Sequence, residues 1–279
     1  LECFEEGQTA AAAIPDPELE DLCRANRVNV LAQLGRWDEA LDVAGPDPSP
    51  ELLARISGGR ARSAFQLGLD AMDGEDWPAA SQQMFLVLET APEGEETLRV
   101  AAHTNLRMIA HHQGRVALQD GDHPAAAQHL AVALEHAGFE EDPGTEARLL
   151  QDLGMLKFEL QDSRAALEFL DQALSAAEAT QDAALLRTVH FHLGLVCLES
   201  DAPRARTELE AAINLAIDAE DELAAASRYN LGILLYREGE LASSRAALET
   251  AHRMYTTLGS AEHAGQLQEY LDEFPEVEQ

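Results

Sequence analysis

Residues 64–92 read AFQLGLDAMDGEDWPAASQQMFLVLETAP, and this stretch decides the fold. A Leu67-Gly68 pair is followed by a polar turn at residues 74–76, then by the small residue Ala80 and, four positions later, by the apolar Met84. Glycine inside a helix costs about 1 kcal/mol relative to alanine. We therefore interpret Gly68 as a point of close approach between two antiparallel helices joined by the turn.

The same order of a glycine, a small residue and an apolar residue, which we call the glycine code, recurs four more times along the chain. The later glycines are Gly114, Gly154, Gly194 and Gly232, so successive glycines are 46, 40, 40 and 38 positions apart. Each is followed by a small residue, then by an apolar one four positions on: Ala126 and Leu130, Ala166 and Leu170, Ala205 and Leu209, Ser244 and Leu248. Self-similarity at this period predicts a helical solenoid, in which one unit cannot bury its apolar face without a neighbour.

Residues 64–92 resemble a tetratricopeptide repeat (TPR). The residues at that family's signature positions are Leu67, Gly68, Trp77, Ala80, Val87 and Pro92. The period near 40 is closer to the long-repeat variants of the family than to the usual repeat of about 34 residues. The resemblance implies an all-α, right-handed superhelical solenoid of about six antiparallel helix pairs plus a terminal capping helix.

We expect one solenoid domain over residues 1–279. Residues 1–15 are predicted to form an N-terminal helix or cap, and residues 16–50 an incomplete first repeat that ends at the proline-rich segment 45–50. Five regular repeats follow over residues 51–258, the first helix of which is expected to be weakened at Gly58-Gly59. Residues 259–274 are predicted to be a capping helix and residues 275–279 a tail. Strand-like alternation is not evident, so sheet content should be negligible.

The charge of the chain restricts its partners. It carries 51 acidic against 19 basic residues, a formal net charge of −32. Such a surface repels phosphate backbones and anionic lipid, so we expect no nucleic-acid or membrane partner, whereas a basic or amphipathic peptide would be attracted. The alternative is that the acidic faces are only solvated, or are an adaptation to high salt. No apolar run is long enough for a membrane span, and we expect a cytoplasmic location with reduced cysteines.

Catalytic and metal-binding patterns do not stand out. The sequence has no glycine-rich phosphate loop and no Gly-x-Ser-x-Gly elbow. Adjacent helical residues such as His111 and His112 point about 100° apart, which does not suit a shared metal ion. We therefore predict no enzyme activity, no cofactor and no metal site.

The resemblance to TPR proteins implies that the first helix of each pair lines a concave groove. Carrying the register across gives these candidate groove residues: Phe65, Leu69, His111, His112, Arg115, Gln151, Met155, Phe158, Phe191, His192, Leu195, Tyr229, Asn230, Ile233, Tyr236 and Arg237. The alternative for any single aromatic residue is simple packing between helix pairs.

The chemical groups of these candidate groove residues predict a function. The mixture of aromatic, amide, imidazole and guanidinium groups is typical of peptide-binding surfaces. The sequence therefore predicts a non-catalytic interaction module or adaptor that holds a protein, peptide or helix. The alternative is a peptide-sensing or self-assembling regulatory region of a larger bacterial-type protein, in which homo-oligomerisation would occur.

Overall fold

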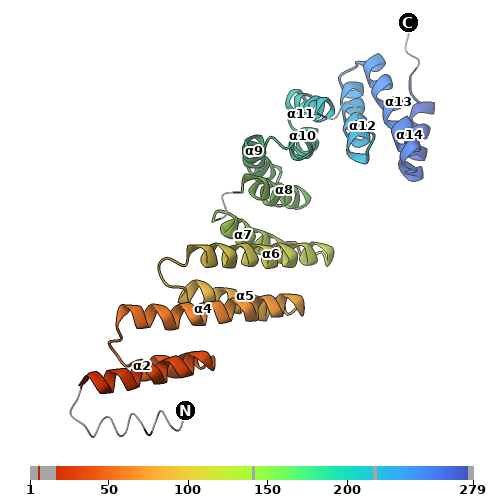
Figure 1. The fold of residues 1–279 in the computed structure, drawn as a ribbon. Coiled ribbons are helices and arrows are strands. Elements are labelled where there is room, and N and C mark those ends of the chain that lie inside the picture. The colour runs from red at the N-terminus through yellow and green to blue at the C-terminus, as the bar shows by residue number, and fades with distance from the viewer. Residues whose placement is uncertain (1–5, 7–16, 140–141, 216–218, 276–279) are drawn as a thin grey trace. The chain divides into compact units, whose positions relative to one another are not determined.

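The computed structural model describes residues 6, 17–139, 142–215 and 219–275, and within these ranges every regular element is an α-helix (Figure 1). The all-α prediction is confirmed. The helices are α2 (Pro17–Gln33), α3 (Trp37–Ala44), α4 (Pro50–Asp73), α5 (Trp77–Thr90), α6 (Glu96–Gln119), α7 (His123–Ala137), α8 (Pro143–Glu159), α9 (Ser163–Thr180), α10 (Ala183–Cys197), α11 (Ala202–Asn214), α12 (Glu222–Arg237), α13 (Leu241–Leu258) and α14 (Ala261–Asp272). The predicted N-terminal helix of residues 1–15 and the end of the tail lie outside the described residues.

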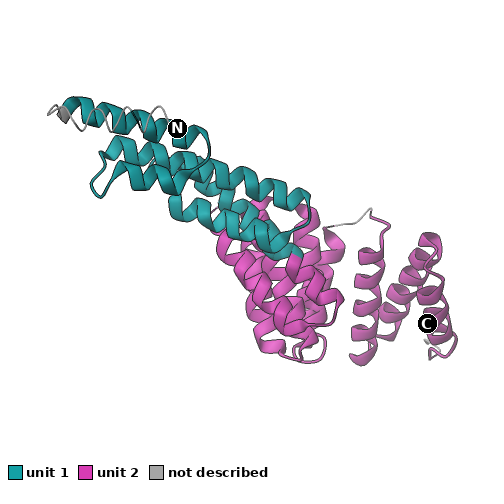
Figure 2. Cartoon of the chain, turned by 90° about the horizontal axis from the view of Figure 1, so that it is seen from below, with its two compact units in different colours: residues 1–112 teal, residues 113–279 magenta. Residues whose placement is uncertain are grey.

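The helices belong to two compact units, residues 1–112 and residues 113–279 (Figure 2). The first unit contains α2 to α5 and most of α6; the second contains the last turns of α6 and α7 to α14. In each unit, consecutive helices form antiparallel pairs, such as α4 with α5 and α8 with α9. Helix pairs are thus the repeating structural unit, as the periodic code predicts.

The glycine code acts through direct contact with the apolar residue of the partner helix. A Cβ atom added to Gly154 would lie 2.7 Å from Leu170 Cγ and 3.2 Å from the Ala166 carbonyl oxygen. The equivalent glycines on α4, α6, α10 and α12 lie against Met84, Leu130, Leu209 and Leu248. These apolar residues and the small residues that precede them are fully buried. The code therefore marks the closest contact within each helix pair.

Aspartate residues begin most of these helices. Asp76, Asp122, Asp162, Asp201 and Asp221 each accept a hydrogen bond from the backbone amide three positions on. Such a cap satisfies one of the amides that the first helical turn leaves unpaired. Asp142 likewise caps α8, which begins at Pro143, by accepting hydrogen bonds from the Gly144 and Thr145 amides.

The weak point expected at Gly58-Gly59 is not a break. Helix α4 is continuous from Pro50 to Asp73, and a Cβ atom on Gly59 would lie 2.6 Å from the Trp37 ring. Gly59 makes room for this indole at the first turn of α3. The glycine therefore serves packing between the incomplete first repeat and the repeat that follows it.

Arginine residues connect one repeat to the next. Arg148 of α8 lies 3.4 Å from Asp182, the cap of α10, and Arg187 of α10 lies 2.7 Å from Asp221, the cap of α12. Arg187 is only 16% exposed. Burial opposes ionisation of Asp221, but hydrogen bonds from the Ala224 amide and from Arg187 outweigh it and lower the pKa of Asp221. One carboxylate thus caps a helix and holds the preceding repeat.

The double role of Asp221 can be separated by substitution. Asp221→Ala removes the cap and the ion pair, and we expect it to lower the free energy of unfolding by about 1–2 kcal/mol. Asp221→Asn keeps a capping side chain and should cost about half as much, as should Arg187→Met, which removes the ion pair alone. Urea unfolding followed by circular dichroism measures all three. An equal loss from the alanine and asparagine variants would mean that the cap contributes nothing.

Candidate functional site: the inner face of the second unit

Three first helices of the second unit form a layer. Helices α8, α10 and α12 contact one another more extensively than the second helices α9, α11 and α13 do. A stack whose members approach more closely on one side curves toward that side. We call the solvent-facing side of α8, α10 and α12 the inner face.

The predicted groove residues of these helices lie at intermediate depth. Most are half-buried, whereas the residues of the glycine code are fully buried. The half-buried set is Gln151, Met155, Phe158, Phe191, His192, Leu195, Asn230 and Ile233. Phe158 and Ile233 also pack against the hydrophobic core of the unit. The inner face is therefore a mixed surface that is partly supported by the core.

Two polar atoms on the inner face lack a hydrogen-bond partner. They are Gln151 Oε1 on α8 and His192 Nδ1 on α10. Burial lowers the pKa of His192 to about 4, although the charge of Asp152 acts in the opposite direction. His192 is thus neutral at pH 7. Buried polar atoms in proteins normally have partners, so these two atoms are unsatisfied hydrogen-bonding positions of this face.

The neutral state of His192 predicts a pH-dependent stability. The unfolded histidine binds a proton near pH 6.5, whereas the folded one resists protonation down to about pH 4. In this window the unfolded state binds more protons, so stability falls as the pH falls. Between pH 7 and pH 5 we expect His192 to contribute a loss of about 2 kcal/mol. Urea unfolding of wild type and His192→Asn across this range measures it, and parallel pH profiles of the two proteins would contradict the assignment.

One end of the inner face contacts the last helix and the residues that follow it. Tyr236 of α12 packs edge-on against Tyr270 of α14 at 6.0 Å between ring centroids and against Phe274 at 5.3 Å. Arg237 donates a hydrogen bond to Glu199 at 2.9 Å, so its charge is already paired. Tyr229, which precedes Tyr236 by about two helical turns, is 38% exposed, and Tyr236 is 37% exposed. Helix α14 (Ala261–Asp272) thus contacts the predicted α12 stripe at Tyr236.

The predicted groove residues of α4 and α6 have varied surroundings. Phe65 and Leu69 are half-buried against the core of the first unit. His112 is exposed, and its ring lies 4.3 Å from the Trp77 ring at an angle of 32°. His111 is half-buried and Arg115 is exposed.

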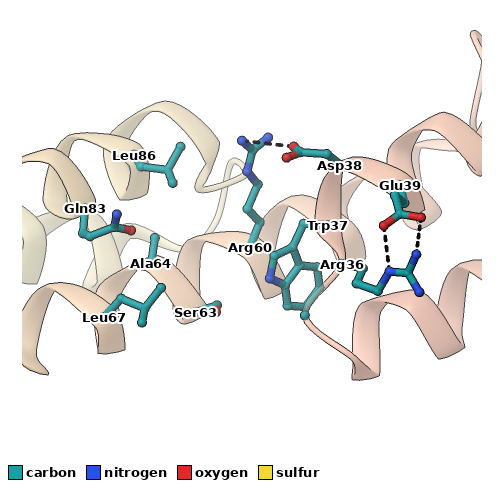
Figure 3. Close-up of a pocket in the computed structure, with 11 residues that line it drawn as sticks. Arg36, Trp37, Asp38, Glu39, Arg60, Ser63, Ala64, Leu67, Gln83 and Leu86 are labelled. Carbon is teal, nitrogen blue, oxygen red and sulfur yellow. Dashed lines mark hydrogen bonds and ion pairs between the residues drawn. The ribbon is translucent and has the colours of Figure 1, made fainter.

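A separate hollow of about 270 Å³ lies in the first unit between α3, α4 and α5 (Figure 3). Arg60 crosses it to Asp38 at 3.2 Å, while Arg36, which precedes α3, donates two hydrogen bonds to the Glu39 carboxylate. These bonds lower the pKa of Glu39. The two arginines and the two carboxylates of the lining cancel in charge. The hollow therefore has no preference for an ionic ligand of either sign.

A polar cluster between α9, α10 and α11 has no counterpart among the sequence-based predictions. Glu208 of α11 is buried, and its carboxylate lies 2.7 Å from His190 Nδ1 and 3.5 Å from Arg204 Nε. Arg204 also pairs with Asp171 of α9. Arg204 and Glu208 have the i,i+4 spacing of a helical ion pair, which was a usable sequence signal. Asp171 and His190 come from other helices, and only the 18-residue spacing of His190 and Glu208, from a first helix to its partner, could have suggested their contact.

The described residues offer no metal site and no membrane span. Across residues 17–139, 142–215 and 219–275, no group of three or more histidine, cysteine, aspartate or glutamate side chains is placed to hold a metal ion. Within the same ranges, no helix is both long enough and apolar enough to cross a bilayer.

Comparisons with known proteins support the fold. No protein-family model matches this sequence, and no curated protein matches it. The solved structure of the apo form of RapI matches with a TM-score of 0.58 at 12% identity, over 77% of each chain. BtubC (BKLC) from P. vanneervenii matches with a TM-score of 0.50 at 18% identity, over 84% of this chain and 92% of that one.

A third structure is longer than this chain. It is a Signal Transduction ATPase with Numerous Domains protein with a tetratricopeptide repeat sensor, from Pyrococcus horikoshii, with a TM-score of 0.50 and 14% identity. The match covers 91% of this chain but 45% of that one. At these identities the similarity establishes the fold. The chain has the fold of a helical-repeat solenoid, which is the fold that its resemblance to tetratricopeptide repeats implies.

Proposed function

We propose that this chain is a non-catalytic interaction scaffold that binds a segment of another protein along the inner face. The observation that carries the proposal is the pair of unpartnered polar atoms, Gln151 Oε1 and His192 Nδ1, on adjacent helices of that face. A peptide backbone supplies both donors and acceptors along its length. It can therefore satisfy an amide oxygen and a neutral imidazole together.

The surroundings of these two atoms suit a peptide. Met155 and Leu195 are half-buried on the same helices and give apolar contact without requiring one fixed shape. The net charge of −32 favours a partner segment that is basic or amphipathic. Apolar anchors with a few polar groups that fix register are the usual composition of a peptide-binding surface.

Capture with the full chain tests this proposal. Met155→Glu/Leu195→Glu places two charges on the inner face, and the matched control Gln172→Glu/Ser175→Glu places the same charges on α9, away from that face. We expect the wild type and the control to retain the same partner from a lysate of the source organism, identified by mass spectrometry, and the inner-face variant to lose it. Circular dichroism first establishes that both variants are folded. Equal capture by all three proteins would contradict the proposal.

Self-assembly is the competing outcome. Light scattering over a range of concentrations measures it directly. A concentration-dependent mass that the inner-face variant abolishes would show that the partner is a second copy of this chain.

A further inference from the structure

All four tyrosines of the chain lie on its last three helices: Tyr229, Tyr236, Tyr255 and Tyr270. Three of them border a hollow of about 190 Å³ between α12, α13 and α14. The lining consists of Tyr229, Tyr255, His263, Gln266, Leu267 and Tyr270. Pockets for whole small molecules usually enclose about 300–1,000 Å³, so this hollow has room for about one side chain.

The walls of the tyrosine hollow are held in place by packing. Tyr255 and Leu267 are 7% and 3% exposed and form its buried part. The His263 ring stacks on Tyr255 at 5.1 Å with 19° between the planes. Tyr270 is fixed on its other side by Phe274 and Tyr236, each at 6.0 Å. Tyr229, His263 and Gln266 form the exposed part of the lining, so a guest meets largely preformed aromatic surfaces.

The lining of the hollow contains no lysine or arginine that would repel a cation. Burial raises the pKa of Tyr255, and the negative charge of Glu222 acts in the same direction. Glu222 accepts a hydrogen bond from Ser260 at the start of α14. Helix α14 carries acidic residues and no lysine or arginine.

The arginines near the hollow in sequence do not themselves occupy it. Arg237 is held by Glu199. Arg228 donates to the Ala224 carbonyl, and neither Arg228 nor Arg253 lines the hollow.

We propose that the tyrosine hollow binds one arginine side chain of a basic partner segment. A guanidinium group stacks on aromatic rings by cation–π attraction, and its donors can reach the Gln266 amide oxygen and the phenol oxygens. The inference rests on the proposed scaffold function, because it assigns one anchor point of the partner. A neutral guest or a second copy of this chain are the competing occupants.

Tyrosine labelling gives a direct readout, since all four ring signals come from this corner of the chain. The full chain with ring-¹³C tyrosine is titrated with the peptide Ac-GSGRGSG-NH₂ and with the same peptide carrying citrulline, which has nearly the shape of arginine but no charge. We expect the Tyr229 and Tyr270 signals to shift saturably with the arginine peptide. Citrulline should weaken binding by about five- to tenfold, as should Tyr229→Ala.

A second variant serves as the matched control. Phe85→Ala removes an exposed aromatic ring from α5 in the first unit and should leave the titration unchanged. The proposal is overturned if the signals do not move, if citrulline binds as well as arginine, or if the signals shift with protein concentration alone. Because capture by the inner face is tested at Met155 and Leu195, a failure here leaves that result standing, and the reverse also holds.

Discussion

Leu170→Ala will lower the free energy of unfolding by about 2–5 kcal/mol, among the largest effects of any single substitution in this chain. Leu170 is fully buried, and its branched end lies against Gly154 of the partner helix. Truncation leaves a cavity at the tightest contact of the α8–α9 pair, where the two helices cannot easily move closer. Urea unfolding followed by circular dichroism measures the loss.

The opposite change at the same contact is also expected to destabilise. Gly154→Ala places a methyl group 2.7 Å from Leu170 Cγ, and such overpacking costs about 1–3 kcal/mol despite the better helix propensity of alanine. Gly265→Ala is the control, because a Cβ atom there meets nothing within 4 Å. That variant should be more stable than wild type by about 0.5–1 kcal/mol. Equal responses at the two glycines would contradict the contact.

Glu208→Ala will cost about 2–4 kcal/mol, the second large effect. The Glu208 side chain is 12% exposed, and its removal leaves His190 and Arg204 without the carboxylate that they share. Glu208→Gln preserves the shape and one acceptor, so its cost should be smaller, about 1 kcal/mol. An alanine variant as stable as wild type would mean that the cluster contributes nothing to folding.

The pH dependence of the Glu208 effect has a defined sign. Burial raises the pKa of Glu208, but the hydrogen bond and charge of His190 and Arg204 outweigh it, so the folded pKa lies below the usual value. A carboxyl group with a lowered folded pKa stabilises the fold above its unfolded pKa of about 4.3 and loses this contribution as the pH falls through the folded pKa. The difference between wild type and Glu208→Gln should therefore shrink below about pH 4. A difference that grows with acidity would contradict the role of His190 and Arg204 in lowering this pKa.

The helix pairs could be predicted because their code is local. A glycine, a small residue eleven or twelve positions later and an apolar residue four positions after that define one contact, and the structure places Gly232 against Leu248 as this spacing requires. Helix boundaries followed from the aspartate and proline residues at the turns. Asp142 and Pro143, for example, form the cap and the first turn of α8.

Side-chain contacts between different pairs could not be predicted in the same way. The sequence shows which face of a helix a residue occupies, but the neighbour across that face depends on how the helices are rotated and spaced. This is why the paired charge of Arg237, the burial of His192 and the tyrosine hollow emerge only in the structure. The Arg187–Asp221 connection had a usable signal, since the capping aspartates Asp182 and Asp221 recur near the repeat period.

A double-mutant cycle on Gly154 and Leu170 tests the central claim that the repeated glycine is a packing device between paired helices. In the Leu170→Ala background the cavity accepts the new methyl group, so Gly154→Ala should be neutral or stabilising, and the coupling energy should exceed about 1 kcal/mol. We predict this rescue. Additive losses, with Gly154→Ala equally destabilising in both backgrounds, would contradict it.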